Sequence, residues 1–168
     1  MTNIDAALKA SRAAVEQMME LGEQADAGWS RSPLPGKWSP SQIVEHVAMS
    51  LEESARVACG QPSKFPTLPA LVHPVVRAVF FRRVLKKAAF PKAKTNAAMN
   101  PAAGPPTPAA GRARLEAAHA EFDASCRALA SRDAPIKTTI FGAVPVADYV
   151  RFMEIHTRHH GRQIGDYR

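Results

Sequence analysis

The distribution of the 14 prolines constrains the fold of this chain more than any other feature of its sequence. Proline lacks a backbone donor and fixes its own φ angle, so it is disfavoured inside helices and central strands. Most of the prolines fall between residues 61 and 110, and long runs on either side contain none. The sequence therefore predicts long helices before and after an irregular central segment.

Four stretches place apolar residues at the three- and four-residue spacing of an amphipathic helix. The start of the second is the most clearly marked, because Ser39 and Pro40 provide an N-cap followed by proline in the first turn, and Gln42 completes a capping box. Clusters of glycine and proline separate the stretches. Helices are predicted over residues 3–26, 39–58 and 109–131, and from Val146 onward.

Four helices with one long crossover between the second and the third predict an all-α four-helix bundle. A chain of 168 residues fits one domain with a real hydrophobic core, so residues 1–168 are predicted to form a single domain with an irregular insertion over 61–110. Within the insertion, residues 74–89 predict a basic amphipathic helix. Residues 91–108 predict an extended or mobile loop, which serves either as a lid or as a simple insertion.

The charge of the chain is unevenly distributed. Its formal net charge of +7 favours anionic ligands, nucleic acid or an acidic membrane surface, but much of the excess lies in one cluster. That cluster forms either a solvated basic face or an anion-binding surface. Nucleic-acid binding is not favoured, because the chain has no recognised DNA- or RNA-binding motif and few aromatic residues near the cluster. The cluster consists of Arg82, Arg83, Lys86 and Lys87.

Cysteine usage and hydropathy predict the cellular location of the protein. Cys59 and Cys126 do not form a CxxC pair, and the N-terminal residues lack the continuous apolar stretch of a secretory leader. No stretch reaches the roughly 18 apolar residues that a transmembrane helix needs. We therefore expect a cytoplasmic protein with no transmembrane segment, in which both thiols are buried.

Three histidines predict a metal site. His156 and His160 are four residues apart in the last predicted helix, so both imidazoles can reach one ion. They replace apolar side chains on the inward face, where an unpaired imidazole would cost about 1–3 kcal/mol. His46 faces inward from the second helix. Together they suit zinc, nickel or iron with one open position; alternatively, each hydrogen-bonds separately in the core.

Two motifs carry a family resemblance. The first, GKWSPSQIVEHVAMSLEE, contains His46, and the second, EIHTRHHGRQI, contains His156 and His160. Together they resemble the paired signature of the DinB/YfiT-like superfamily, especially its DUF1569-type branch. The resemblance implies a DinB-like helical bundle that holds one metal ion on these three histidines, the first of which follows a tryptophan-serine-proline start.

The HHxxQ ending of the second motif adds two residues around the site. His159 lies off the face that the ligands share, and Gln163 can hydrogen-bond to His159 or His160, so both are predicted in a second shell around the metal. One feature departs from the family. Relatives of the DUF1569 type often have a histidine-proline pair just before the FG that is found here in TTIFGAV, and that histidine is absent. A His73-Pro74 pair occurs elsewhere.

The predicted chemistry follows from an open metal position. Such an ion can lower the pKa of a bound water or thiol and so generate a nucleophile near neutral pH. The similarity to thiol-dependent transferases of the superfamily implies that a low-molecular-weight thiol binds the metal and attacks a small-molecule electrophile. The protein would then be a metal-dependent thiol S-transferase or hydrolase. The alternative is a non-catalytic metal-binding stress-response or interaction protein, whose bundle pairs with another copy to form a homodimer.

Overall fold

The computed structural model of the protein describes residues 3–25, 28–91 and 95–166. It confirms the predicted all-α class, to which it adds only a short two-stranded hairpin. Within these ranges, no helix has the length and hydropathy that a bilayer-spanning segment requires. The four long helices are α1 (Asn3–Gln24), α2 (Pro40–Ala58), α5 (Pro108–Ala130) and α6 (Val146–Gly165).

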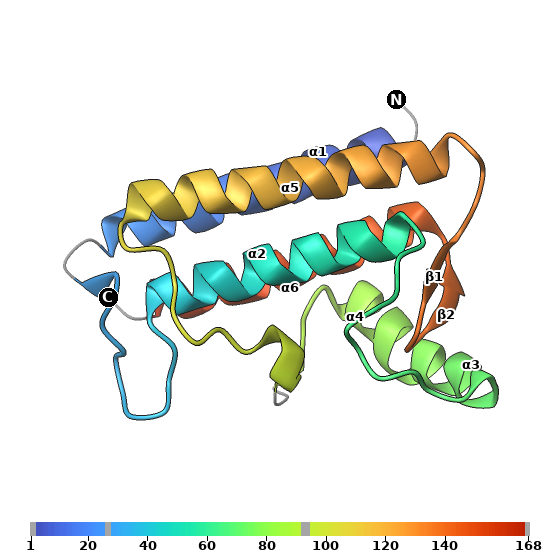
Figure 1. Ribbon diagram of the computed structural model, residues 1–168, viewed down its shortest axis with the longest axis horizontal. Coiled ribbons are helices and arrows are strands. Elements are labelled where there is room, and N and C mark those ends of the chain that lie inside the picture. Colours follow the sequence, from blue (N-terminus) through green and yellow to red (C-terminus); the bar gives the residue numbers. More distant parts are fainter. Residues whose placement is uncertain (1–2, 26–27, 92–94, 167–168) are drawn as a thin grey trace.

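The four helices form two layers, with α1 and α5 in one and α2 and α6 in the other (Figure 1). α1 packs mainly on α6, and α2 packs mainly on α5, whereas α2 and α6 approach each other at fewer points. Arg114 of α5 forms ion pairs with Glu45 and Glu52 of α2, and these ion pairs link the two helices at the surface of the bundle. The wider separation of α2 and α6 leaves room between them for the site described below.

Local sequence signals set the starts of α2 and α5. The Ser39 hydroxyl accepts the Gln42 N–H at 3.2 Å, and the Ser39 N–H donates to the Gln42 side chain at 3.0 Å, so the predicted capping box is present. Thr107 caps α5 through its side-chain hydroxyl, which accepts the Ala110 N–H at 3.1 Å. These caps satisfy backbone donors that the first turn of a helix leaves unpaired.

Apolar side chains from all four long helices fill one continuous core. Cys126 lies within it, and burial raises the pKa of its thiol to about 12. The prediction that both thiols are buried is wrong for Cys59, which is exposed because it follows the last turn of α2 at the C-cap position. The largest fully buried side chains include Leu8, Met18, Ile43, Leu51, Leu115, Phe122 and Ile164.

A nearly continuous helical segment occupies the first half of the connection between α2 and α5. Its middle is a π-helical turn that places Phe81 against the core, and it ends where Ala88 adopts a left-handed φ of 47°. The helix begins four residues earlier than its predicted start at Pro74. It comprises the 3-10 turn Ala70–Val72, α3 (His73–Val76), the π-helix Arg77–Phe81 and α4 (Arg82–Lys87).

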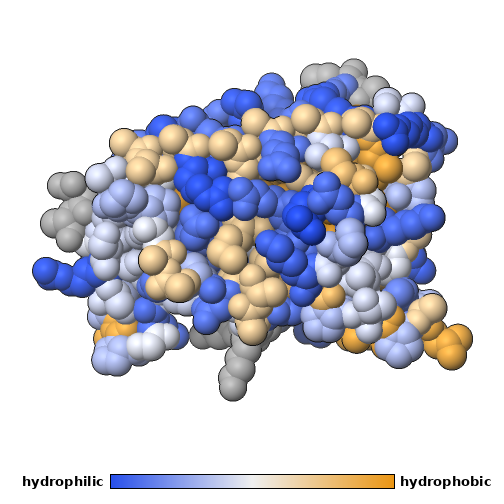
Figure 2. Space-filling model, in the orientation of Figure 1, coloured by the Kyte–Doolittle hydropathy of each residue, from blue (hydrophilic) through white to orange (hydrophobic). Residues whose placement is uncertain are grey.

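The outer face of this segment is divided into two parts. Leu71, Val75 and Val79 are exposed near its start, and the hydrophobic patch is visible at the lower right of Figure 2, over α3. The basic cluster Arg82, Arg83, Lys86 and Lys87 is exposed near its end. Exposed apolar side chains thus precede exposed basic ones along this helical segment.

The second half of the connection is attached to the bundle by specific contacts. The Pro105 carbonyl accepts hydrogen bonds from the Trp29 indole at 2.8 Å and from the Ser41 hydroxyl at 2.7 Å. Gly104 lies so close to α2 that a Cβ atom there would be 2.3 Å from the Ser41 backbone oxygen. A short 3-10 turn, Ala97–Met99, places the buried Met99 beneath α2. This proline-rich stretch is therefore part of the packed structure.

A hairpin joins α5 to α6. β1 (Ile136–Thr138) pairs antiparallel with β2 (Gly142–Val144), with Ile136 opposite Val144, and both of these side chains are buried. The carbonyl of Thr139 in the turn accepts hydrogen bonds from the Leu68 N–H at 2.9 Å and from the His73 ring at 3.2 Å. The hairpin thereby joins the end of the bundle to the helical segment 70–87.

Candidate metal centre

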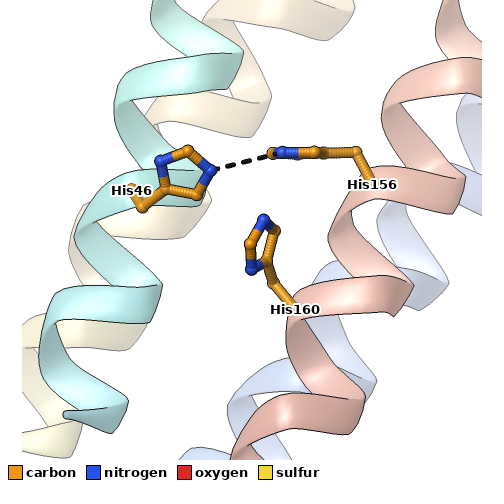
Figure 3. A group of neighbouring side chains, drawn as sticks. All are labelled: His46, His156 and His160. Carbon is orange, nitrogen blue, oxygen red and sulfur yellow. Dashed lines mark hydrogen bonds between the residues drawn. The ribbon is translucent and has the colours of Figure 1, made fainter. Parts of the chain in front are cut away.

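Three histidines converge between α2 and α6. His46 extends from α2, and His156 and His160 extend from successive turns of α6, so their rings face one another (Figure 3). One nitrogen from each ring lies within 4.8 Å of the others, and the Nε2 atoms of His46 and His156 are 3.3 Å apart. His46 is 4% exposed and His160 is 7% exposed. The structure thus brings the three predicted residues together as a group that could hold a metal ion.

The outer ring nitrogens of two histidines are fixed by hydrogen bonds. His46 Nδ1 is 2.7 Å from the carbonyl oxygen of Met99, and His160 Nδ1 is 2.8 Å from the side-chain oxygen of Gln163. A carbonyl oxygen only accepts, so each Nδ1 carries the proton. Each neutral ring therefore keeps its lone pair on Nε2, the nitrogen available to a metal.

Burial keeps the three imidazoles neutral. Desolvation lowers the pKa of His46, lowers that of His156 well below its ordinary value, and lowers that of His160 to about 3. The neighbouring histidines lower the pKa of His156 and His160 further, because a second positive charge would repel the first. Neutral imidazole is the form that coordinates metals.

The arrangement fits a divalent cation that accepts imidazole nitrogen. Two nitrogens bound to a tetrahedral ion at about 2.0–2.1 Å lie roughly 3.3 Å apart, which matches the separation of the His46 and His156 Nε2 atoms. Without an ion, two facing Nε2 atoms share at most one proton. In addition, His156 Nδ1 is buried and has no hydrogen-bond partner among the residues that the structure describes.

His159 and Gln163 lie beside the group of three. The Gln163 amide nitrogen is 3.3 Å from His159 Nε2, while its oxygen accepts from His160, so one side chain links the two histidines. The indole of Trp38 covers the other side, with its ring centre 4.9 Å from that of His46 and 6.4 Å from that of His160. These contacts hold the ring planes of His46 and His160.

The three histidines line a cavity of about 940 Å³. Aromatic side chains form much of the adjoining wall, and the ring of Phe90 lies 5.2 Å from that of His156. Phe90 in turn contacts Phe152 at 4.8 Å, which stacks near Tyr149 at 6.2 Å. The aromatic wall therefore runs from the histidines toward the opposite end of the cavity. Its members are Phe80, Phe90, Phe141, Tyr149 and Phe152.

A family model described as the DinB superfamily matches residues 4–164. The chain belongs to the DinB superfamily. The match includes α1, the segment between α2 and α5, and all three histidines, so it extends well beyond the two motifs that suggested it. No curated protein and no solved structure matches the chain significantly. Assignment to the DUF1569-type branch stays a prediction.

The sequence did not indicate every residue at this DinB-superfamily site. Met99 contributes through its backbone carbonyl, for which a side chain gives no signal. Phe90 comes from the irregular segment, where no periodic pattern assigns it to a face. Glu53 also lines the cavity, and its place seven residues after His46 on α2 is a signal that could have revealed it.

His73 occupies a position of interest because of the histidine that TTIFGAV lacks. Its ring nitrogen Nε2 donates to the Thr139 carbonyl, and its side chain packs against Gly142, whose φ is +68°. The His73-Pro74 pair therefore contacts the same hairpin from a different part of the chain. His73 does not lie among the residues that line the cavity.

Proposed function

We propose that this protein is a metal-dependent enzyme of the DinB type, in which His46, His156 and His160 hold one divalent zinc, nickel or iron ion. The observation that carries the proposal is a set of three neutral imidazoles, two buried and one half-buried, that meet at the wall of a cavity. Structural zinc sites are usually closed by four protein ligands, whereas catalytic sites have three and an open position. Three histidines beside a cavity correspond to the second arrangement.

The proposed chemistry is activation of a low-molecular-weight thiol for transfer to an electrophile, or of water for hydrolysis. When bound, the ion would lower the pKa of such a nucleophile toward neutrality. The Met99 carbonyl and Gln163 hold His46 and His160 in the tautomers that leave Nε2 free. We assign His159 and Gln163 to a second shell that orients the ligands. The aromatic wall excludes water and positions an apolar small-molecule substrate.

A second candidate is a non-catalytic metal-binding protein that pairs with another copy. The exposed apolar side chains Leu71, Val75 and Val79 support it, because contiguous exposed apolar residues often mark interaction sites. Sedimentation of the purified protein distinguishes a dimer from a monomer.

The two free cysteines support a reducing, cytoplasmic location for either candidate.

Metal analysis tests the proposal directly. We expect one ion per chain after purification, and we expect His156→Ala to abolish stoichiometric binding because it removes one of three ligands. His119→Ala is the matched control, since His119 is also buried but hydrogen-bonds to Ser11 on another pair of helices. Absence of the ion from the wild-type protein, or its equal loss from both variants, would contradict the metal site.

A second measurement tests the thiol. With cobalt in place of the native ion, thiols that enter the site should change the visible absorption spectrum of the wild-type protein. If cobalt binds stoichiometrically but a panel of thiols leaves the spectrum unchanged, thiol activation is excluded while the metal site stands.

A further inference from the structure

A buried carboxylate lies in the wall of the cavity that contains the three histidines. Glu53 follows His46 by seven residues on α2, which places it about 10 Å farther along the helix axis. It is only 2% exposed. One oxygen, Oε1, accepts hydrogen bonds from the Ser63 hydroxyl at 2.8 Å and from the Lys64 N–H at 2.6 Å. The other, Oε2, has no hydrogen-bond partner among the described residues.

Arg56 forms an ion pair with this oxygen but donates no hydrogen bond to it. Arg56 Nε lies 3.6 Å from Glu53 Oε2, beyond a normal N–H···O distance, and Nε is itself without a hydrogen-bond partner in the described part of the chain. Another nitrogen of Arg56 donates to the Pro62 carbonyl on the surface. A buried carboxylate oxygen without a donor is costly, so a ligand that supplies one would be favoured there.

The hydroxyl groups around Glu53 cannot supply the missing donor. The Ser54 hydroxyl donates to the Ser50 carbonyl at 2.7 Å, so the Tyr149 hydroxyl, 3.1 Å away, must donate to Ser54. Burial raises the pKa of Tyr149 to about 12, which keeps that proton in place at neutral pH. Ser63 donates to Glu53 itself, and Ser50 donates to the His46 carbonyl.

The two ends of the cavity therefore differ in chemistry. The histidine end offers nitrogen lone pairs to a metal, whereas at the other end the wall contains the Glu53 carboxylate and the Tyr149 hydroxyl, whose oxygens are hydrogen-bond acceptors. The aromatic wall connects the two ends. A complementary ligand has several hydrogen-bond donors and a positive charge at one end, an apolar middle and its reactive group at the other end. Aromatic rings near the charge add to this preference, because they attract cations.

We propose that Glu53 forms a subsite for a protonated amine, so that the substrate or thiol cosubstrate of this protein is an amine-bearing molecule with an apolar body. The proposal deepens the proposed function and depends on it only for the group placed at the histidines. The amine N–H groups donate to Glu53 Oε2 and to the Tyr149 oxygen, while Oε1 keeps its bonds to the loop after α2.

Calorimetric titration with three probes of similar shape tests the subsite. 4-Phenylbutylamine carries a positive charge, 4-phenyl-1-butanol is neutral and 5-phenylpentanoate is negative, and each is titrated into the full-length protein with and without zinc. We expect the amine to bind at least about tenfold more tightly than the alcohol, and the carboxylate to bind most weakly. Equal binding of amine and alcohol, or tightest binding of the carboxylate, would overturn the subsite.

Glu53→Gln separates ligand binding from loop attachment. The amide keeps one oxygen for Ser63 and Lys64 and removes the negative charge, so we expect the preference for the amine to disappear while binding of the alcohol is retained. Glu52→Gln is the control, because it makes the same charge change on the adjacent residue, which pairs with Arg114 on the outer side of α2. An amine preference that survives Glu53→Gln, or that is lost equally in Glu52→Gln, contradicts the proposal.

A second variant covers the case in which Glu53→Gln does not fold. Tyr149→Phe removes one acceptor and retains the ring, and we expect it to reduce the amine preference about threefold; an unchanged preference opposes the proposal. The metal content of the same samples distinguishes the two ideas. An amine preference in protein that binds no metal leaves the subsite standing and the proposed function refuted, whereas bound metal without an amine preference refutes the subsite alone.

Discussion

The helical bundle and the segment between α2 and α5 contribute to one site in different ways. The bundle supplies side chains: His46, His156 and His160 project from regular helices into a shared space. The connecting segment supplies a backbone carbonyl from Met99 and, through Phe80 and Phe90, part of the aromatic wall. A helical side chain can be assigned to a face from its spacing, but a carbonyl group is common to every residue. For this reason the metal-binding side chains of the bundle could be predicted from the sequence, whereas the contribution of the connecting segment could not.

The largest expected effect is a pH dependence of stability caused by the three histidines of the bundle. The pKa values of His46, His156 and His160 are lowered in the folded protein, so below about pH 6.5 the unfolded chain binds protons that the folded chain does not. The free energy of unfolding of the metal-free protein should therefore be independent of these groups above pH 6.5. It should fall as the pH drops toward the folded pKa, which is about 3 for His160, by up to about 1.4 kcal/mol per pH unit for each histidine.

Denaturant titrations between pH 7.5 and pH 5 measure this slope, and most carboxylates remain ionised over that interval. His160→Gln should show a shallower slope than the wild-type protein, because one of the titrating groups is gone. A stability that stays constant over the interval would mean that the histidines are as easily protonated in the folded chain as in the unfolded one.

The next effect tests whether the connecting segment is structural. Gly104→Ala places a Cβ atom against the Ser41 backbone, and we expect the free energy of unfolding to fall by about 1–3 kcal/mol as the chain shifts to relieve the overlap. Gly28→Ala is a suitable control, because nothing lies within 4 Å of the added atom. Equal stability of the two variants would show that residues 95–107 are not held against α2.

A smaller effect concerns the hydrogen bonds behind the ligands. Gln163→Ala removes the acceptor that orients His160, and metal affinity should weaken about 10- to 100-fold, as is typical when such a partner is lost. Competition with a chromophoric chelator measures the change. Arg162→Ala serves as the control, since it alters an exposed neighbour on the same helix. Affinity that is equally reduced in both variants would point to a general effect on α6.

The smallest expected effect concerns the side chain of Met99, whose backbone carbonyl contacts His46. Met99→Leu changes the side chain but preserves the carbonyl that accepts from His46, so metal affinity should stay within about threefold of the wild-type value. The same chelator competition provides the measurement. A loss as large as that of Gln163→Ala would show that the Met99 side chain contributes to the site in its own right.

Much of the fold could be predicted because its signals are local. The Ser39–Gln42 capping box is set by four consecutive residues, and the spacing of His156 and His160 places both on one face whatever surrounds them. The lack of a hydrogen bond to Glu53 Oε2 could not be predicted in this way. It depends on where the chain after α2 places Ser63 and Lys64, and those contacts span ten and eleven residues through an irregular turn.

The two cysteines offer a practical consequence. Cys126 is buried with a thiol pKa of about 12, whereas Cys59 is exposed at the end of α2, the helix that carries both His46 and Glu53. A maleimide dye should therefore label the native chain at one position, six residues from Glu53. The unsubstituted protein thus carries an attachment point for a fluorescent reporter, so that entry of ligands into the cavity can be followed by emission intensity without engineering a new residue.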